Sequence, residues 1–465
     1  MQKLPPTLNL RSCIFLVVGL IIGSGVFKKI VPMSVALQSP TLVLGCWVLA
    51  GLVSLAGALC TAEMASLFPN SGGEYFYFQK VYNRFFAFLY GWANFAVMKT
   101  ASIAALAYIF SQSVNNIIPL PQWTSAPGTV SHFFIDNFSI KVLASGLIAA
   151  LSYLNYRGIR KAEKLSRVMT ILLLVASVLI IGAGLMSGKG SFSHLTTPSA
   201  YAIQNPLTGW HLFSAVIIAS LGAFWGYEGW NSIGHIGEEI KNPKKNLPLA
   251  LGIGTLIVMT VYVLLNLVYF YILPVDSFIA LKNTPNKIAA VEVLRTIGGS
   301  AGALFISVLI LVTTFNACNT TILASARVFY AMARDGIFFS KASTVHPQYE
   351  TPSVSLGLQC LWSTFMIWSG SFDQLTDMLI FASFIFYGST AFGLIRMRVK
   401  APELERVYKV PGYPFVPALF CLFCLMLLVF TLYNQPREAL AGLGLIALGI
   451  PFYMYWTRGK KQENI

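Results

Sequence analysis

The sequence has few charged residues. Asp, Glu, Lys and Arg together make up 11% of the 465 residues, whereas hydrophobic residues make up 56%. Soluble domains usually carry roughly 25% charged residues, so this composition excludes an ordinary soluble protein. Apolar runs of about 20 residues recur along the chain, and each is long enough to cross a bilayer as a helix. The sequence therefore predicts an all-α integral membrane protein with about twelve transmembrane helices in the lipid bilayer. The expected spans lie near residues 10–37, 41–67, 85–117, 141–156, 163–187, 211–237, 248–273, 300–332, 353–369, 375–397, 413–433 and 438–456.

Cysteine and histidine are also scarce, with seven and five residues. The cysteines lie in or beside apolar spans and not in the predicted outside loops, so no disulfide framework is expected. The histidines lack the spacing of metal ligands. Neither a nucleophile paired with a base nor a metal cluster is evident. The sequence therefore predicts no metal site, no cofactor and no enzyme activity.

Acidic residues number only 17 against 32 basic ones. Such an excess could indicate nucleic-acid binding, but the basic residues lie in short loops between apolar spans. With the N-terminus in the cytoplasm, about 23 of the 32 fall in inside segments. We therefore expect no nucleic-acid partner and a multi-pass protein of the cell membrane with both termini in the cytoplasm. The first apolar run is too long for a cleavable signal peptide and lacks a small-residue cleavage site.

The first apolar run is interrupted by Gly23, Ser24 and Gly25. A glycine costs a helix about 1 kcal/mol relative to alanine, and within lipid each freed backbone group needs a partner. Unwound backbone at this depth is typical of a segment that lines a cavity, where its N–H groups and the following half-helix can bind a carboxylate. The alternative is a small-residue face for helix packing. The break predicts the binding of a small solute with an anionic group.

A second break is expected at residues 221–231, where three glycines and Glu228 interrupt the sixth apolar run. The two breaks open two sets of five spans, residues 1–190 and 205–400, and residues 410–465 hold the last two helices with a short cytoplasmic tail. Five spans in each half give the halves opposite orientation, which is the inverted repeat of many secondary transporters. The substrate then lies near the midplane, between the halves.

Lys99 lies inside the third apolar run, and Glu228 lies at the second break. Charges within a membrane are costly and are usually functional and paired. A lysine that extends to the lipid surface is the alternative for Lys99. We predict that Lys99 and Glu228 are electrostatically coupled, directly or through water.

Five motifs, taken together, resemble the L-type amino acid transporter family of the amino acid-polyamine-organocation (APC) superfamily. They lie at residues 18–27, 69–75, 227–243, 326–336 and 411–414, in the order of that family and over nearly the whole chain. The resemblance implies the LeuT-like fold, a 5+5 inverted repeat with discontinuous helices 1 and 6. It also implies sodium-independent exchange of L-amino acids, most simply neutral ones, by alternating access.

The resemblance also implies a substrate site. It places the substrate carboxylate on the backbone of Gly23, Ser24 and Gly25, and the ammonium on carbonyls of Ile21 and of the Phe224–Trp225 segment. Trp225 matches an aromatic lid, with a packing role as the alternative. The expected substrate residues are Ile21, Gly23, Ser24, Gly25, Phe224, Trp225, Gly226, Glu228 and Asn319. Trp225, Lys99 and Glu228 are the residues expected in gating or charge coupling.

The sequence departs from the family pattern in three places. An apolar stretch around Leu173 replaces a lysine that many members carry in helix five, which leaves ion coupling open. Lys28 and Lys29 make the expected outer vestibule basic, either as solvated lining residues or to attract anionic substrates. The loop at residues 119–141 lacks the cysteine that tethers animal members to a glycoprotein, so we expect a stand-alone bacterial protein of the inner membrane without a disulfide-linked heavy chain.

Two alternatives to exchange remain. A symporter would use a proton on Glu228 or a sodium site with Thr313, Thr314 or Asn316. An amino acid sensor normally carries a long soluble tail, and both termini are short.

Overall fold

The computed structural model describes residues 6–121, 137–283, 287–369 and 372–458, with only the backbone of residues 159–163. Its regular structure is helical, and two isolated bridges, Leu8 with Ile240 and Ser71 with Ile236, are the paired backbone segments outside the helices of these residues. The predicted loop at 119–141 falls largely outside the described residues.

The first part of the chain forms long helices joined by several short ones. In order they are α1 (Leu10–Ile21), α2 (Gly25–Lys28), α3 (Ile30–Leu37), α4 (Pro40–Leu67), α5 (Glu74–Val81), α6 (Arg84–Ala93), the π-helix η1 (Asn94–Met98), α7 (Lys99–Ile117), α9 (Phe138–Tyr156) and α10 (Ile159–Met186).

The remainder is built in the same way. It contains η2 (Phe192–Leu195), α11 (Ala200–Gln204), α12 (Gly209–Tyr227), η3 (Trp230–His235), η4 (Gly237–Glu239), α13 (Pro243–Ile272), α14 (Val275–Ala280), η5 (Leu281–Asn283), α15 (Ala289–Arg334), η6 (Ser340–Ser343), α16 (Ser353–Ser369), α17 (Phe372–Lys400), α18 (Phe415–Asn434), α19 (Pro436–Ala447) and α20 (Gly449–Arg458).

Local sequence signals explain where several helices begin. Asn9 caps α1, because its Oδ1 accepts a hydrogen bond from the Ser12 N–H at 3.0 Å. Ser39 precedes α4, whose first residue is Pro40, a favourable residue at this position. Within α15 the backbone leaves the helical region at Gly298 and Gly299. The start of the expected span at residues 300–332 therefore coincides with this kink.

Eleven helices of the described residues are long and apolar enough to cross a membrane. The helix α16 has 17 residues, the short end of the spanning range, and packs against α7, α9 and α15. With α16 the count reaches the predicted twelve. The prediction of an all-α membrane protein is confirmed, whereas the division into two repeats stays a prediction.

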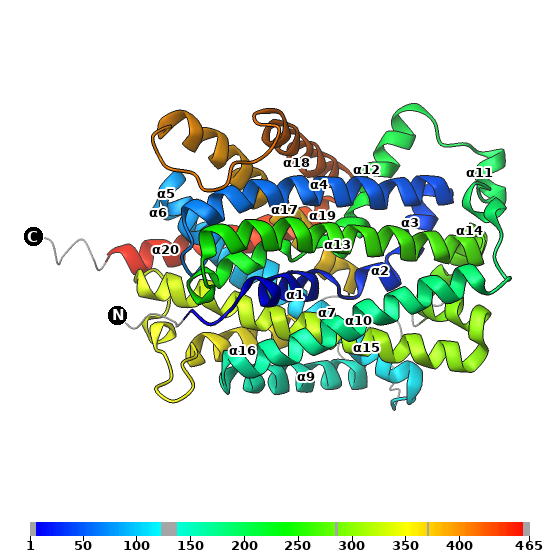
Figure 1. Cartoon of the computed structure of the whole chain (residues 1–465), viewed down its shortest axis with the longest axis horizontal. Helices are drawn as coiled ribbons and strands as arrows, with labels where there is room; N and C mark the ends of the chain where they lie inside the picture. Colours follow the sequence, from blue (N-terminus) through cyan, green and yellow to red (C-terminus); the bar gives the residue numbers. More distant parts are fainter. Residues whose placement is uncertain (1–5, 122–136, 284–286, 370–371, 459–465) are drawn as a thin grey trace, which may run out of the picture.

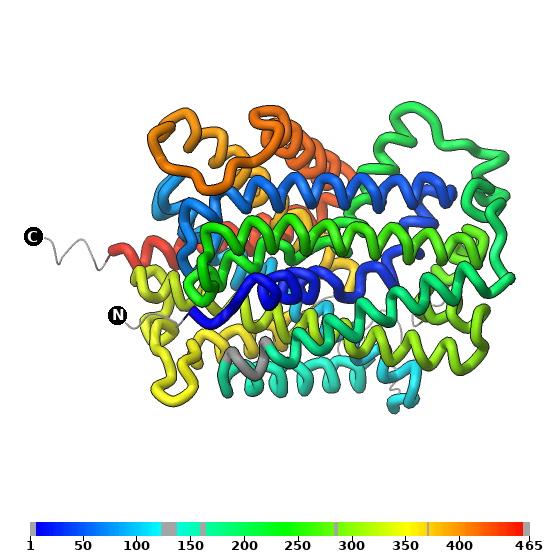
Figure 2. Tube along the Cα trace, in the orientation of Figure 1, coloured from blue at the N-terminus to red at the C-terminus, as the bar shows by residue number. Residues whose placement is uncertain are grey.

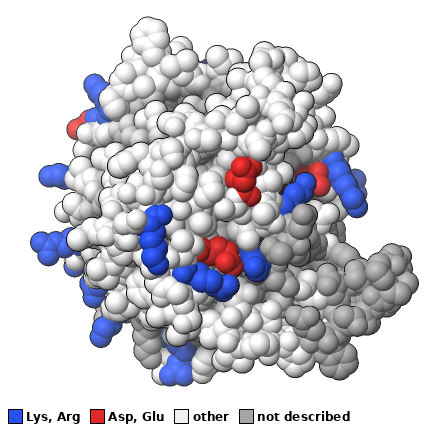
Figure 3. Space-filling view, turned by 90° about the vertical axis from the view of Figure 1, so that its right-hand side faces the viewer, with Lys and Arg blue, Asp and Glu red and all other residues white. Residues whose placement is uncertain are grey.

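The long helices run side by side along the long axis of the molecule, and α1 lies in the middle of them (Figure 1). It packs against α10, α13, α15 and η3. The tube in Figure 2 shows that the chain crosses the molecule repeatedly and that the described residues begin and finish at the same end of the molecule. We call this the inner end. The opposite, outer end carries α3, α11 and α14, and its surface is mostly uncharged, with some basic and acidic side chains that lie next to one another (Figure 3).

Candidate functional site

The predicted break in the first span is confirmed. The helix α1 ends at Ile21 and α2 begins at Gly25, so residues 22–24 separate them. Lys29 has φ −71° and ψ −11°, so α2 and α3 continue in nearly the same direction. The first N–H groups of such a helical segment lack partners within the helix and carry partial positive charge. The backbone at Ser24 and Gly25 can therefore bind an anionic group.

The second break is narrower than predicted. Gly222 and Gly226 lie within α12, which continues to Tyr227. Glu228 is extended, and Gly229 has φ +113°, a conformation that other residues rarely adopt. The last carbonyls of α12 have no partners within the helix, although the Trp225 oxygen accepts the Glu228 N–H at 3.3 Å. The end of α12 therefore carries partial negative charge.

The two breaks are in direct contact. A Cβ atom added to Gly25 would lie 2.9 Å from the backbone nitrogen of Gly226, and one added to Gly229 would lie 3.0 Å from the carbonyl carbon of Leu20. Each added Cβ would lie closer still to another backbone atom, the Cα of Gly226 or the carbonyl oxygen of Leu20, so neither position tolerates a side chain. The glycines thus let the positive start of α2 and the negative end of α12 lie side by side.

Trp225 covers the first break. Its indole N–H donates a hydrogen bond to Ser24 Oγ at 3.2 Å. Its ring meets the ring of Phe372, at the start of α17, edge to face with centroids 5.9 Å apart. Phe372 in turn lies under the amino groups of Lys28 and Lys29, which are 4.5 and 5.0 Å from its centroid. The stack places Trp225 between the break and the outer end.

Lys29 is a buried residue, not a solvated lining residue. Its side chain is 3% exposed, and its Nζ donates to Asp373 Oδ1 at 2.8 Å and to Thr376 Oγ1 at 3.0 Å. Asp377 Oδ1 lies 3.7 Å away. Lys28 donates to Gln112 Oε1 at 3.1 Å. These contacts link the α2–α3 segment to α17 at the outer end.

Lys99 and Glu228 form the predicted pair. The two atoms Lys99 Nζ and Glu228 Oε1 are 2.8 Å apart, and the side chains are 2% and 5% exposed. Tyr387 of α17 donates to the other carboxylate oxygen at 2.7 Å. The π-helix η1 directly precedes Lys99 and sets the direction of α7. Neither η1 nor Tyr387 was predicted from the sequence.

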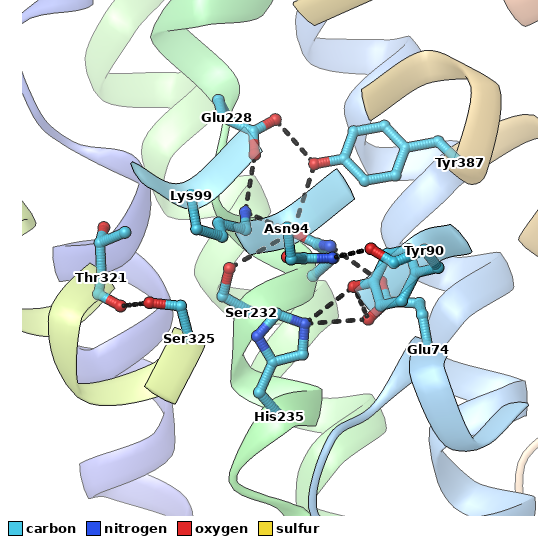
Figure 4. A network of polar contacts seen from close by, with 11 residues as sticks. Glu74, Tyr90, Asn94, Lys99, Glu228, Ser232, His235, Thr321, Ser325 and Tyr387 are labelled. Carbon is cyan, nitrogen blue, oxygen red and sulfur yellow. Dashed lines mark hydrogen bonds and ion pairs between the residues drawn. The ribbon is translucent and has the colours of Figure 1, made fainter. Parts of the chain in front are cut away.

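The pair continues toward the inner end as a buried network (Figure 4). Asn231 Nδ2 donates to Glu74 Oε1 at 2.9 Å, and its Oδ1 lies 3.5 Å from Lys99 Nζ. Tyr90 donates to Glu74 Oε2 at 3.0 Å, and His235 Nε2 lies 3.3 Å from the same oxygen. We call the following residues the inner network: Glu74, Tyr90, Lys99, Glu228, Asn231, His235 and Tyr387. The motif at 69–75 was the signal that could have indicated Glu74.

On the other side of α1, polar groups of α15 form hydrogen bonds with α1, α10 and α9. Thr320 donates to the Gly19 carbonyl at 3.3 Å, and Asn316 donates to Thr170 of α10 at 3.1 Å. Asn319 accepts a hydrogen bond from Asn155 of α9 at 2.9 Å, and its role at the substrate site stays a prediction. The hydroxyls of Thr313 and Thr314 bond to the Ile310 carbonyl within their own helix. Leu173 is 1% exposed, so the site of the missing lysine is filled by packing.

The N-terminal segment forms contacts at the inner end. The N–H groups of Thr7 and Leu8 both donate to the Glu239 carbonyl at 2.9 Å. The Glu239 side chain is held by Arg327 of α15, with Nε 3.0 Å from Oε1 and both side chains 1% exposed. These contacts tie the start of α1 to the segment that follows η3.

Over residues 8–453 the chain matches the family described as amino acid permease. The chain belongs to this family. It is 31% identical over 450 residues to the serine/threonine exchanger SteT of Bacillus subtilis (strain 168), covering 96% of this chain and 95% of that protein. It is 30% identical over 465 residues to the human b(0,+)-type amino acid transporter 1, covering 98% and 89%.

A third relative is the large neutral amino acids transporter small subunit 2 of Mus musculus, with 30% identity over 462 residues, covering 98% of this chain and 82% of that protein. The family and these relatives are transporters, so the chain is a multi-pass amino acid transporter of the APC superfamily and not an enzyme. The resemblance and the LeuT-like fold class are confirmed.

Proposed function

We propose that the protein exchanges neutral L-amino acids across the membrane by alternating access, independently of sodium. The observation that carries this proposal is the contact between the two breaks. An α-amino acid carries a carboxylate and an ammonium on one carbon. The start of α2 attracts the first group and the end of α12 attracts the second. The Gly25–Gly226 approach brings the two ends side by side, so one small molecule could contact both.

In this proposal the backbone of Gly23, Ser24 and Gly25 binds the carboxylate. Carbonyls at Ile21 and in the Phe224–Trp225 turn bind the ammonium. The Ile21 oxygen accepts a hydrogen bond from Tyr262 at 3.2 Å and retains a second lone pair. Gly226 faces the substrate side chain, and Asn319 contributes a polar group from α15.

The charge balance near the breaks favours neutral substrates. Glu228 lies at the end of α12, but its carboxylate is neutralised by Lys99. A substrate with a charged side chain would therefore find no free partner of opposite sign in this pair. The names of two relatives, a serine/threonine exchanger and a large neutral amino acids transporter subunit, agree with this choice.

Alternating access would break two sets of contacts in turn. At the outer end Lys29 is bound to Asp373 and Thr376, and Trp225 covers the break. At the inner end Thr7 and Leu8 are bound to Glu239. Opening one set while the other holds would expose the site to one side at a time.

We place the protein in the bacterial inner membrane with its inner end in the cytoplasm, acting without a disulfide-linked heavy chain. The described ends of the chain lie at the inner end (Figure 1). Purification of the chain alone, followed by transport measurements, tests this part of the proposal.

Proteoliposomes test the exchange itself. Uptake of radiolabelled serine or leucine in sodium-free buffer should rise strongly when the lumen contains unlabelled amino acid. Empty vesicles should take up little. Accumulation in empty vesicles under an imposed sodium or proton gradient would instead establish symport. Vesicles that contain the Gly25→Val variant provide the background, because protein is still present in the membrane but the contact between the breaks is crowded.

A further inference from the structure

Glu74 and His235 form a second buried ionisable pair, next to the pair of Lys99 and Glu228. Glu74 begins α5 and is 1% exposed, and His235 ends η3 and is 0% exposed. The proposed exchange mechanism uses neither residue. A buried ionisable pair without an assigned role requires an explanation, because burial of charge is costly unless it is balanced.

The charges of the inner network do not balance while His235 is neutral. Lys99 supplies one positive charge, whereas Glu74 and Glu228 each supply one negative charge. Tyrosine hydroxyls ionise only near pH 10 or above and stay neutral. One further proton on the pair of Glu74 and His235 makes the network neutral. Without it, one negative charge is buried and uncompensated.

The ring of His235 has a place for this proton. Its Nε2 lies 2.9 Å from the Tyr90 hydroxyl and 3.3 Å from Glu74 Oε2. Its Nδ1 is buried and has no hydrogen-bond partner among the described residues. If Nε2 carries a hydrogen toward Tyr90 and Glu74, Nδ1 can accept a proton from water. If the proton sits on Glu74, Nε2 accepts its hydrogen bond. Both arrangements add one proton to the pair.

Other ionisable side chains face the pair from several elements, and none of them supplies the missing positive charge. They are Tyr77 of α5, Tyr90 of α6, Lys99 of α7, Glu228 at the second break and Tyr387 of α17. Lys99 is already counted, and loss of its proton would make the imbalance larger.

The pair lies on the inner side of the second break. The His235 carbonyl accepts the Gly72 N–H at 2.9 Å, and Ser71 forms a bridge with Ile236. These contacts cover the pair with the turn before α5. Solution at the inner end can reach it only when this part of the molecule opens.

We propose that Glu74 and His235 together bind one proton from the solution at the inner end, and that this proton controls opening of the inner end. The closed form buries the pair and therefore favours the bound proton. Loss of the proton leaves an uncompensated buried charge, which favours opening to water. The proton returns to the same side, so exchange responds to pH at the inner face without carrying protons across. Proton binding by the pair stands apart from the proposed exchange, whereas control of opening rests on it.

Proton binding is tested first without transport. Glu74→Gln keeps an oxygen for Asn231 and makes the network neutral with one proton fewer. We expect the Tm of the wild type in nanodiscs, relative to Glu74→Gln, to rise as the pH falls from 8 to 5.5, by on the order of 1–2 °C per pH unit. If Glu74→Gln does not fold, His235→Gln serves as the second variant. The rise in its Tm with falling pH should then occur at lower pH than in the wild type. Parallel Tm curves for wild type and variants would overturn the proposal.

Oriented vesicles test control of exchange. Serine exchange by the wild type should depend on pH at the inner face, by at most about tenfold per pH unit for a single proton, and not on pH at the outer face. Glu74→Gln should give a flat profile. His211→Asn, which changes an exposed histidine of α12, should keep the wild-type profile. A profile that is flat in the wild type, or proton movement across the membrane with the substrate, would overturn control from the inner side. Complete loss of exchange at every pH would instead count against the proposed function.

Discussion

Removal of the Lys99 charge should destabilise the protein more than removal of the Glu228 charge. The side chains of Lys99 and Glu228 are 2% and 5% exposed. Loss of one partner of a buried pair typically costs about 3–5 kcal/mol, because the other charge is left unpaired. A carboxylate can escape by taking up a proton, at a cost of about 4 kcal/mol at pH 7 for a group of ordinary acidity.

The neighbouring residues make the two variants different. In Lys99→Met the Glu228 carboxylate remains without its cation, so we expect a loss of about 4 kcal/mol, near the upper limit set by protonation. In Glu228→Gln the lysine still faces Glu74 through Asn231, which lies 3.5 Å from Nζ and 2.9 Å from Glu74. We expect that loss to be about 2 kcal/mol. The double variant should lose about 3 kcal/mol, well below the sum of the single losses.

The assay is thermal unfolding of purified variants, measured with serine exchange in proteoliposomes. The amide oxygen introduced by Glu228→Gln can still accept the hydrogen bond of Tyr387, so the double variant keeps the shape of the site. A matched control is the exposed pair of Lys287 and Glu292, 3.9 Å apart and partly solvated, whose removal should cost less than about 1 kcal/mol. Additive losses at the central pair, or a larger loss for Glu228→Gln than for Lys99→Met, would refute the reasoning.

Three further changes test the proposed site. Gly25→Val should abolish amino acid binding by calorimetry without loss of the folded protein, whereas Gly146→Val, at a position with no atom within 4 Å of an added Cβ, should bind normally; binding by the first variant would exclude the backbone site. Trp225→Ala should lower the exchange rate far more than the amount of protein in the membrane, in contrast to Trp210→Ala at an exposed tryptophan of α12, and near-normal exchange would make Trp225 a packing residue. Asp373→Asn should weaken the ion pair with Lys29. In a background that carries Ser24→Cys, it should therefore increase labelling of that cysteine by a membrane-impermeant thiol reagent added outside. Unchanged labelling would show that this pair does not close the outer end.

The membrane helices could be predicted well because composition alone determines them. Every expected span contains a helix, and the break in the first span lies where Gly23, Ser24 and Gly25 predicted it. The break in the sixth span was placed too broadly. Gly226 stays helical and allows a close approach of α4, because an added Cβ would lie 2.7 Å from the ring of Trp47. Glycine in a membrane helix can indicate either unwinding or close approach, and one sequence does not distinguish them.

Contacts between distant segments could not be predicted in the same way. The pairing of Lys99 with Glu228 followed from the cost of burying each charge. Lys29 and Asp373 are 344 residues apart, and their spans gave no comparable reason to join them. The partners of Glu74 depend on η3, a short 3-10 helix that starts after Gly229. Such contacts are fixed by how the helices pack, which local sequence patterns do not record.

Ion pairs connect the two predicted halves at three levels. Lys29 and Asp373 join them at the outer end, Lys99 and Glu228 in the middle, and Glu63 with Arg398, 2.6 Å apart, at the inner end. A relative movement of the halves about the middle pair would separate the outer and inner pairs unequally. Each of these contacts is stronger when water is excluded, so closing one end stabilises its own pair.

If the ends open in turn, as proposed, this arrangement allows Lys99 and Glu228 to remain paired. The middle pair lies beside the contact between the breaks, where the proposed alternating access would require the smallest displacement. A pair at that position can hold the two breaks in register for the substrate without opposing either movement. We therefore expect a cross-link between cysteines introduced at positions 99 and 228 to allow the ends to open and close, whereas a cross-link between positions 29 and 373 should hold the outer end closed and stop exchange. Exchange that survives the outer cross-link would show that this end opens by a different movement.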